Sequence, residues 1–475
     1  MESLNELIFR INPQKIIYIL LLVDWVFYIP IFPSMFAKEK KFLYKENLLI
    51  SFLFALIWLI SILTLIYSNE HSMNLFASII LFSIFRYVFI YKRWKSVRRG
   101  FGAPGFMSYW VITWIMLINL TSISLFIPYK DPVFFLMKFD FAVIMICAGT
   151  YKAFVGYLKN DGMELGASNF LWGHFYNYFS RINLENYFHR IMNILGSIIE
   201  IIAGILILCP TVYIQNIGLI LISISFLYIF LLIRLGRLAL IMVVIPLILM
   251  TNNNYTINNL FEFNTVNTII YVVIFFVLLI KVYQYLILFS KYKFDGFLSS
   301  FLMKLSNFIP IIVWRVFTPD VTNFAIEVFG SNDKYNGYID VYTRNETYNY
   351  LRWKFFWRKI RGLHVTESIA IVSGVFNMKK YFPSKKELFL QRIIVYSKSL
   401  SGFGFKKYKF FKFNYFQICK ENGIIKYELK KTYIVDITKD FCEEVLIDPK
   451  FDDQKLANLS PVKESIAFGS LIRKK

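Results

Sequence analysis

Apolar segments of about 20 residues, the length of a membrane-spanning helix, recur through the first two thirds of this chain. A helix of that length crosses the hydrocarbon core of a bilayer, which is roughly 30 Å thick. The 475 residues are 57% hydrophobic and include 51 Phe, more apolar material than a soluble protein of this size normally carries. The sequence therefore predicts an integral, multi-pass membrane protein.

The predicted fold class is an all-α polytopic membrane bundle of about nine transmembrane helices, followed by a small C-terminal α+β domain. A further segment, 297–317, contains Lys304, Pro310 and Arg315, which favours an in-plane amphipathic helix, with a tenth span as the alternative. The short seventh and eighth spans form either a tight hairpin or a re-entrant pair. The nine spans are expected at 16–36, 48–67, 73–91, 106–128, 139–158, 191–209, 217–233, 236–250 and 267–289.

The composition changes near residue 319, which predicts a domain boundary there. Alternating apolar and polar residues predict strands in "NFAIEVFG", "GYIDVYTR", 407–419 and 423–437, the last two joined by an Asn-Gly turn. Segments 366–383 and 384–400 are predicted helices, the second with a capping box. We therefore expect a transmembrane domain over 1–318, an α+β domain over 319–455 and a disordered tail over 456–475.

The net charge of +22 is divided equally between residues 319–475 and the rest of the chain. In a membrane protein the expected partners of such charge are anionic lipid headgroups; nucleic acid is not expected because no binding module for it is visible. A protein partner is left unassigned. Basic loops follow the first, third, seventh and ninth spans and so fall on one side, which the positive-inside rule makes cytoplasmic. The C-terminal domain would lie on that side.

Neither a metal site nor a zinc motif is predicted. Cys419 and Cys442 lack metal-ligand spacing, although a disulfide between them is an alternative, and His174 and His189 have no third ligand nearby in the sequence. The first apolar segment has no small-residue cleavage site after it, so it is expected to remain as the first span.

Five ionisable residues are assigned to the interior of the spans: Asp24, Arg86, Lys152, Glu200 and Lys281. Such groups are costly in a bilayer and usually face the bundle interior in pairs. All five fall at a similar depth near the midplane, which predicts one pocket or charge network. Lys152 is the candidate general base or ligand hook, oriented by Glu200. The alternatives are a buried ion-pair network that fixes helix register, and a Lys152 side chain that extends to water.

The loop at 159–190 follows Lys152 and is rich in aromatic residues, with Trp172 and His174 as its candidate site residues. It could close a pocket for a flat apolar ligand such as a quinone. The alternative is an aromatic belt at the membrane interface.

The segment "RRGFGAPGF" at 98–106 matches G-x-G-x-x-G, but no strand precedes it, so we reject a dinucleotide site. Backbone N–H groups near Gly102 and Gly105, beside Arg98 and Arg99, instead form a candidate anion site for a lipid headgroup phosphate.

The stretches "AGTYKAFVGYLKNDGMELGASNFLW" (148–172) and "GSIIEIIAGILIL" (196–208) carry a family resemblance. Together they resemble the transmembrane core of vitamin K-dependent γ-carboxylases and of the related bacterial horizontally transferred transmembrane (HTTM) proteins, over about 15–290. The resemblance implies that a lysine base, here Lys152, acts on a reduced quinone, and that Glu200 occupies the place of the acid in the following helix. It also implies a soluble domain outside the cytoplasm, opposite to the side that loop charge favours.

Two departures from the carboxylases narrow the predicted function. The segment "SFLYIFLLIRLGRLAL" (225–240) lacks the His and Asn of their motif, and the C-terminal domain is smaller than theirs, so peptide carboxylation is not predicted. The prediction is an enzyme acting on a quinone or another lipid-soluble substrate. The alternative is a non-catalytic scaffold or lipid-binding protein whose basic tail, with "RWKFFWRKIRG" at 352–362, docks a partner or an anionic membrane surface. A transporter is a third option, disfavoured because no repeat pairs the two halves.

Overall fold

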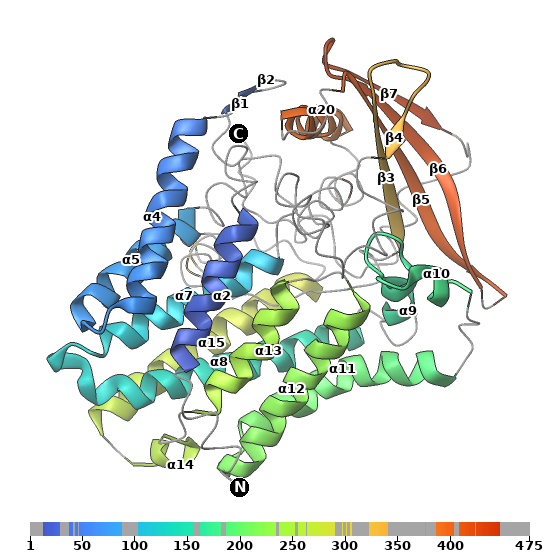
Figure 1. Cartoon of the computed structure of the whole chain (residues 1–475). Coiled ribbons are helices and arrows are strands. Elements are labelled where there is room, and N and C mark those ends of the chain that lie inside the picture. Colours follow the sequence, from blue (N-terminus) through green and yellow to red (C-terminus); the bar gives the residue numbers. More distant parts are fainter. Residues whose placement is uncertain are drawn as a thin grey trace, which may run out of the picture.

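The computed structural model shows a bundle of helices with a small antiparallel sheet beside one end (Figure 1). The residues that the structure describes are 13–28, 38–40, 43–45, 47–87, 103–154, 162–181, 187–233, 237–251, 255–262, 264–289, 297, 301, 305, 323–340, 376, 386–402, 408–422 and 424–446.

Each of the nine predicted spans contains a helix among these residues. The helices are α2 (Pro13–Tyr28), α4 (Leu48–Tyr67), α5 (His71–Arg86), α7 (Ala103–Leu120), α8 (Lys130–Phe154), α11 (Tyr187–Ile207), α12 (Val212–Leu232), α13 (Arg237–Leu249) and α15 (Thr265–Phe289). The predicted tenth segment lies outside the described residues, apart from Phe297, Phe301 and Leu305.

Four helices in the described part of the chain are long and apolar enough to cross a membrane: α4, α8, α12 and α15. Helices α5 and α13 have 16 and 13 residues. At 1.5 Å per residue they cover about 24 and 20 Å, less than the roughly 30 Å hydrocarbon core. Helix length therefore does not support the count of nine crossings. It does support a helix-rich protein that is compatible with a membrane.

The outer helices carry their apolar residues outward, as a lipid-facing helix does. On α4, Phe52 and Ile60 are exposed, whereas Ser51 and Ser61 are buried and donate to backbone carbonyl groups one turn earlier in the chain. A helix of a soluble protein would show the reverse distribution. This distribution is the one that a lipid-facing helix shows, and it is compatible with a membrane-embedded bundle.

Helix α8 is the central helix of the bundle. Its apolar window is 67% buried, against 22–33% for the windows of α4, α12 and α15. Helix α11 packs antiparallel against it, with Gly204 so close to the carbonyl oxygen of Ala142 that a Cβ atom would lie 2.8 Å from it. Small residues allow such close backbone approach between membrane helices.

The C-terminal part forms a five-stranded antiparallel sheet in the order β4-β3-β5-β6-β7. Its strands are β3 (Phe324–Ser331), β4 (Ile339–Asp340), β5 (Phe410–Glu421), β6 (Ile424–Asp436) and β7 (Phe441–Leu446). Asn422, in the predicted Asn-Gly turn between β5 and β6, has a φ of 51°, the left-handed conformation that this turn requires. Strand β7 was not predicted from the sequence. Cys419 and Cys442 are free cysteines, so the alternative of a disulfide bond between them is wrong. The predicted helix at 366–383 lies outside the described residues except for Phe376, and the predicted tail at 456–475 lies outside them entirely.

Helix α20 (Lys386–Gly402) covers one face of the sheet, close to its predicted place at 384–400. Phe389 and Tyr396 of α20 pack their rings against Tyr433 and Phe413, respectively. Helix α20 also contacts β2 (Leu43–Lys45), which pairs with β1 (Lys38–Lys40) in the connection between α2 and α4. Helix α20 therefore lies between the sheet and a loop of the helical bundle (Figure 1).

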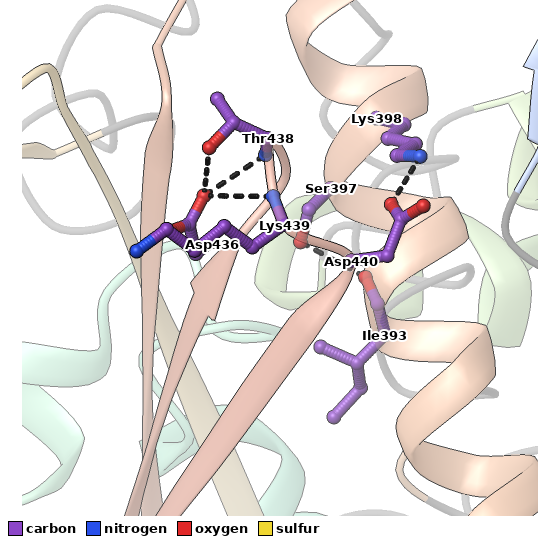
Figure 2. A network of polar contacts seen from close by, with 7 residues as sticks. All are labelled: Ile393, Ser397, Lys398, Asp436, Thr438, Lys439 and Asp440. Carbon is purple, nitrogen blue, oxygen red and sulfur yellow. Dashed lines mark hydrogen bonds and ion pairs between the residues drawn. The ribbon is translucent and has the colours of Figure 1, made fainter.

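The turn between β6 and β7 is held by a polar network (Figure 2). The Asp436 carboxylate accepts from the Thr438 hydroxyl and from the backbone N–H groups of Thr438 and Lys439, and Lys398 of α20 pairs with Asp440. Burial raises the pKa of Asp436, but these hydrogen bonds outweigh it and leave that pKa below its usual value. The network fixes the turn against α20.

Candidate functional site

Lys152 and Glu200 form a buried ion pair between α8 and α11. The Lys152 Nζ atom lies 2.8 Å from the Glu200 Oε1 atom, and the two residues are only 5% and 2% exposed. The Lys152 side chain therefore does not extend to solvent, which excludes that alternative. The other carboxylate oxygen, Glu200 Oε2, is buried and has no hydrogen-bond partner among the described residues.

Glu200 belongs to a polar stripe on α11. Asn193, Ser197 and Glu200, at positions i, i+4 and i+7, are all buried on one face, while Ile194, Ile198 and other apolar residues are exposed on the opposite face. The sequence shows this spacing, but the sequence analysis considered only ionisable residues and so did not include Asn193 and Ser197. The stripe faces α8 and the segment that follows it.

That segment begins with α9 (Gly162–Ser168), whose seven residues are all buried although it connects two helices of the bundle. The Asn193 side chain holds it: Oδ1 accepts from the backbone N–H of Met163 at 2.8 Å, and Nδ2 donates to Glu164 Oε2. Connecting segments usually lie on the surface. We call the buried segment 162–172 the roof; it packs on α11 at Asn193, two turns from Glu200. Glu164 of the roof, 1% exposed, is a residue that the sequence analysis missed.

The sheet packs on the outer side of this roof. The Asn169 side chain donates to the carbonyl oxygen of Phe324 at 2.8 Å, and the Tyr427 hydroxyl donates to the carbonyl oxygen of Ser168. The ring of Phe170 contacts those of Phe416 and Tyr427 at centroid distances of 5.8 and 5.6 Å. The C-terminal domain and the connection after Lys152 therefore lie at the same end of the bundle.

The aromatic residues of this connection are in part structural. Trp172 is buried, and the backbone N–H of His174 donates to the carbonyl oxygen of Leu232 at 2.9 Å, where the connection meets the end of α12. This hydrogen bond ties the connection to α12 rather than to Lys152. Helix α10 (Tyr176–Phe179) follows, and the His189 side chain is outside the described part.

Lys281 belongs to a different cluster, which corrects the prediction of a single network. Its Nζ atom lies 3.2 Å from Asp140 Oδ1, and the Trp110 indole donates to Asp140 Oδ2 at 2.7 Å. Asp140 precedes Lys152 by twelve residues on α8, about 18 Å along the axis. The sequence analysis omitted Asp140, although it lies at the start of the predicted fifth span. The cluster ties α8 to α7 and α15.

A third buried polar contact joins α8 to α12. Lys138 Nζ lies 3.1 Å from the side-chain oxygen of Gln215, and both residues are buried. The sequence placed Lys138 just outside the predicted span, so its burial was not anticipated.

The structure does not place the remaining predicted residues beside Lys152. Arg86 is exposed at the end of α5, where it interacts electrostatically with Tyr109 of α7. The Asp24 side chain is not described, nor are Arg98, Arg99 and Gly102, and of Gly105 only the backbone in the first turn of α7 is described. In the part of the chain that the structure describes, no three His, Cys, Asp or Glu side chains gather as metal ligands would.

The fold and site define a helix-rich protein, compatible with a membrane, with a buried lysine–glutamate pair between α8 and α11 and a buried connecting segment, the roof, packed on α11. Comparisons with protein-family models, with curated proteins and with solved structures give no match. The resemblance to the γ-carboxylase and HTTM proteins thus stays a prediction from the two stretches that carry it.

Proposed function

We propose that this chain is a membrane-embedded enzyme, related to the HTTM and γ-carboxylase-like proteins, that removes a proton from a lipid-soluble substrate of the reduced-quinone class. Lys152 is the base and Glu200 orients it. The observation that supports this proposal is the 2.8 Å contact between the two groups, each more than nine-tenths buried between α8 and α11. Ionisable groups at such a depth are usually functional.

The proton balance of the pair permits a base. Ammonium with carboxylate and amine with carboxylic acid differ only in the position of one proton, and burial penalises the charged arrangement. In the neutral arrangement the Lys152 amine accepts the proton of a substrate hydroxyl, which leaves a substrate anion beside the new ammonium. No further step is assigned to the described residues.

The chemistry of the donor set fits a hydroxylated ring. Glu200 Oε2 is buried with no hydrogen-bond partner in the described part, so it can accept from a substrate hydroxyl while Oε1 remains bound to Lys152. A reduced quinone would supply such a hydroxyl together with an apolar ring suited to the surrounding helices. Two narrow apolar crevices among α2, α7, α8 and α13 lie away from this pair.

The competing role is structural, because an ion pair can fix α8 against α11 without binding a ligand. Purified Lys152→Met and Glu200→Gln proteins in lipid nanodiscs separate the two roles when binding of a ubiquinol or menaquinol is measured. Lys281→Met is the matched control, because it removes the amine of the other buried pair. Loss of quinol binding in the first two variants alone supports the proposal, and unchanged binding in both overturns it.

We also propose the finer topology, in which all nine apolar helices cross the membrane and the basic loops and the C-terminal domain are cytoplasmic. It is supported by the antiparallel packing of α8, α11 and α12 and by the contacts of the sheet with the connection after α8. Single cysteines in a background without the four native ones test it with an impermeant maleimide. Arg181→Cys and Asn332→Cys should react from the cytoplasmic side, and Glu70→Cys and Glu262→Cys from the other. Any other grouping contradicts this topology.

A further inference from the structure

Glu164 is a buried carboxylate that the proposed function does not yet use. It is 1% exposed and lies in the first turn of α9, which packs against α11. Its Oε2 atom accepts from Asn193 Nδ2, and the same Asn193 side chain accepts from the backbone N–H of Met163. A single asparagine of α11 therefore fixes both the backbone and the carboxylate at the start of α9.

The position of Asn193 relates Glu164 to the Lys152 site. Asn193, Ser197 and Glu200 are buried on one face of α11, and Glu200 lies seven residues after Asn193, about 10 Å along the helix axis. Lys152 contacts one end of this stripe, and Glu164 contacts the other. The two carboxylates thus lie at the two ends of one polar stripe in an otherwise apolar surrounding.

Other titratable groups lie beside this stripe on the elements around it. Tyr228 of α12 interacts electrostatically with Glu164, and Tyr427 of β6 donates to the neighbouring carbonyl group of Ser168. Helix α8 contributes Lys152, and α11 contributes Glu200.

We propose that Glu164 is the second carboxylate of the Lys152 site, a positioning residue that acts at a distance to hold the Lys152 amine in its protonated form between turnovers. Two carboxylates around one amine favour the ammonium more than one does, because each stabilises the positive charge. The catalytic consequence rests on the proposed function: Lys152 becomes a base only after its ammonium has passed a proton to the Glu200 carboxylate, and the Glu164 charge opposes that transfer. The electrostatic coupling itself does not depend on any substrate.

The expected size of the coupling is taken from the helical rise of about 10 Å between Asn193, which contacts Glu164, and Glu200, which contacts Lys152. Two unit charges about 10 Å apart at an effective dielectric constant of about 20 interact strongly enough to move a titration by about one pH unit. The Glu164→Gln change removes the charge and keeps an oxygen that can accept from Asn193. Glu164→Asp keeps the charge on a shorter side chain.

The experiment measures the protonation of Lys152 directly in the full-length protein in detergent. Trace labelling with acetic anhydride, an uncharged reagent that modifies only the free amine, is followed by mass spectrometry across a pH series. The labelling midpoint is the pH at which labelling of Lys152 reaches half of its maximum. We expect this midpoint to fall by about one pH unit in Glu164→Gln and to stay near the wild-type value in Glu164→Asp. Glu70→Gln, which removes an exposed carboxylate at the start of α5, is the matched control and should leave the midpoint unchanged.

An unchanged midpoint in Glu164→Gln, with or without a loss of thermal stability, overturns the proposal, because a purely structural role would move only the stability. Equal shifts in Glu164→Gln and Glu164→Asp also overturn it, since packing rather than charge would then be the cause. If Glu164→Gln does not fold, Asn193→Ser provides the second variant. This change removes the side chain that holds Glu164 at the stripe. An unchanged labelling midpoint of Lys152 in Asn193→Ser would also contradict the proposal. Failure of quinol binding in the wild-type protein would remove the proposed function and leave this result standing.

Discussion

Gly149 of α8 lies directly against the backbone of Ser197 on α11. A Cβ atom on Gly149 would come within 2.5 Å of the Ser197 carbonyl oxygen and within 2.7 Å of Ile201 Cγ1. The contact lies one turn before Lys152 and one turn before Glu200 on their respective helices. The absence of a side chain at residue 149 therefore lets the two backbones approach closely enough for the ion pair to form.

A larger residue at this position should separate the helices. We expect Gly149→Val to lower the free energy of unfolding by about 1–3 kcal/mol, the usual cost of overpacking a well-filled interior. It should also weaken the Lys152–Glu200 contact. Thermal unfolding in detergent, followed by intrinsic Trp fluorescence, measures the loss. Ala153→Val, on the exposed face of the same helix, is the control and should be nearly neutral. Equal stability of the two variants would contradict the close contact.

Breaking the ion pair should cost more than removing it. Lys152→Met leaves the Glu200 carboxylate buried without its partner, and Glu200→Gln leaves the Lys152 ammonium buried without its partner. Each change should lower the free energy of unfolding by about 3–5 kcal/mol. The double variant removes both charges and should recover much of that loss. A double-mutant cycle from unfolding free energies gives the coupling. Additive single effects would show that the two groups do not interact.

The second pair should behave independently of the first. Lys281 and Asp140 lie about 18 Å along α8 from the Lys152 level, beyond the distance at which mutational effects usually couple. Lys281→Met should destabilise the protein and leave the labelling midpoint of Lys152 unchanged. Combined with Lys152→Met, its effect on unfolding should add within about 0.5 kcal/mol. A larger deviation would show that the two clusters are coupled, as in the single network that the sequence predicted.

The sequence predicted elements better than it predicted their pairing. Runs of apolar residues predicted the nine long helices of the bundle among the described residues, because such a helix is marked by its composition over its whole length. They could not show that α8 extends back to Lys130, since the acids and lysines of its first turns resemble a loop. The pairing of Lys152 with Glu200 followed from their depths, whereas that of Lys281 with Asp140 did not, because depth alone does not fix which helices are neighbours. Glu164 was missed because it lies in a connection, where no periodicity marks a buried acid.

The β6–β7 turn should show an acid-dependent stability. The folded pKa of Asp436 is below its unfolded value of about 3.9. The carboxylate therefore contributes stability that is fully present above about pH 4 and is lost as the pH falls through the lower folded value. Asp436→Asn should destabilise the sheet by about 1 kcal/mol at pH 7 and by less at pH 3. Hydrogen exchange of the β6 and β7 amides measures this. Glu421→Gln, in an exposed pair with Lys426, is the control and should change little at either pH.

The sheet should hold the roof (162–172) in place against α11. Phe170 is fully buried between α9 and the sheet, with its ring against those of Phe416 and Tyr427. Phe170→Ala removes this contact and should cost about 3–5 kcal/mol locally. Because α9 carries Glu164, hydrogen exchange should quicken over 162–172, and Lys152 should be acetylated faster than in the wild-type protein at the same pH. Phe175→Ala, an exposed ring five residues further on, should change neither. If exchange over 162–172 stays slow in Phe170→Ala, the contacts of α9 with α11 alone hold the roof, and the sheet has another role.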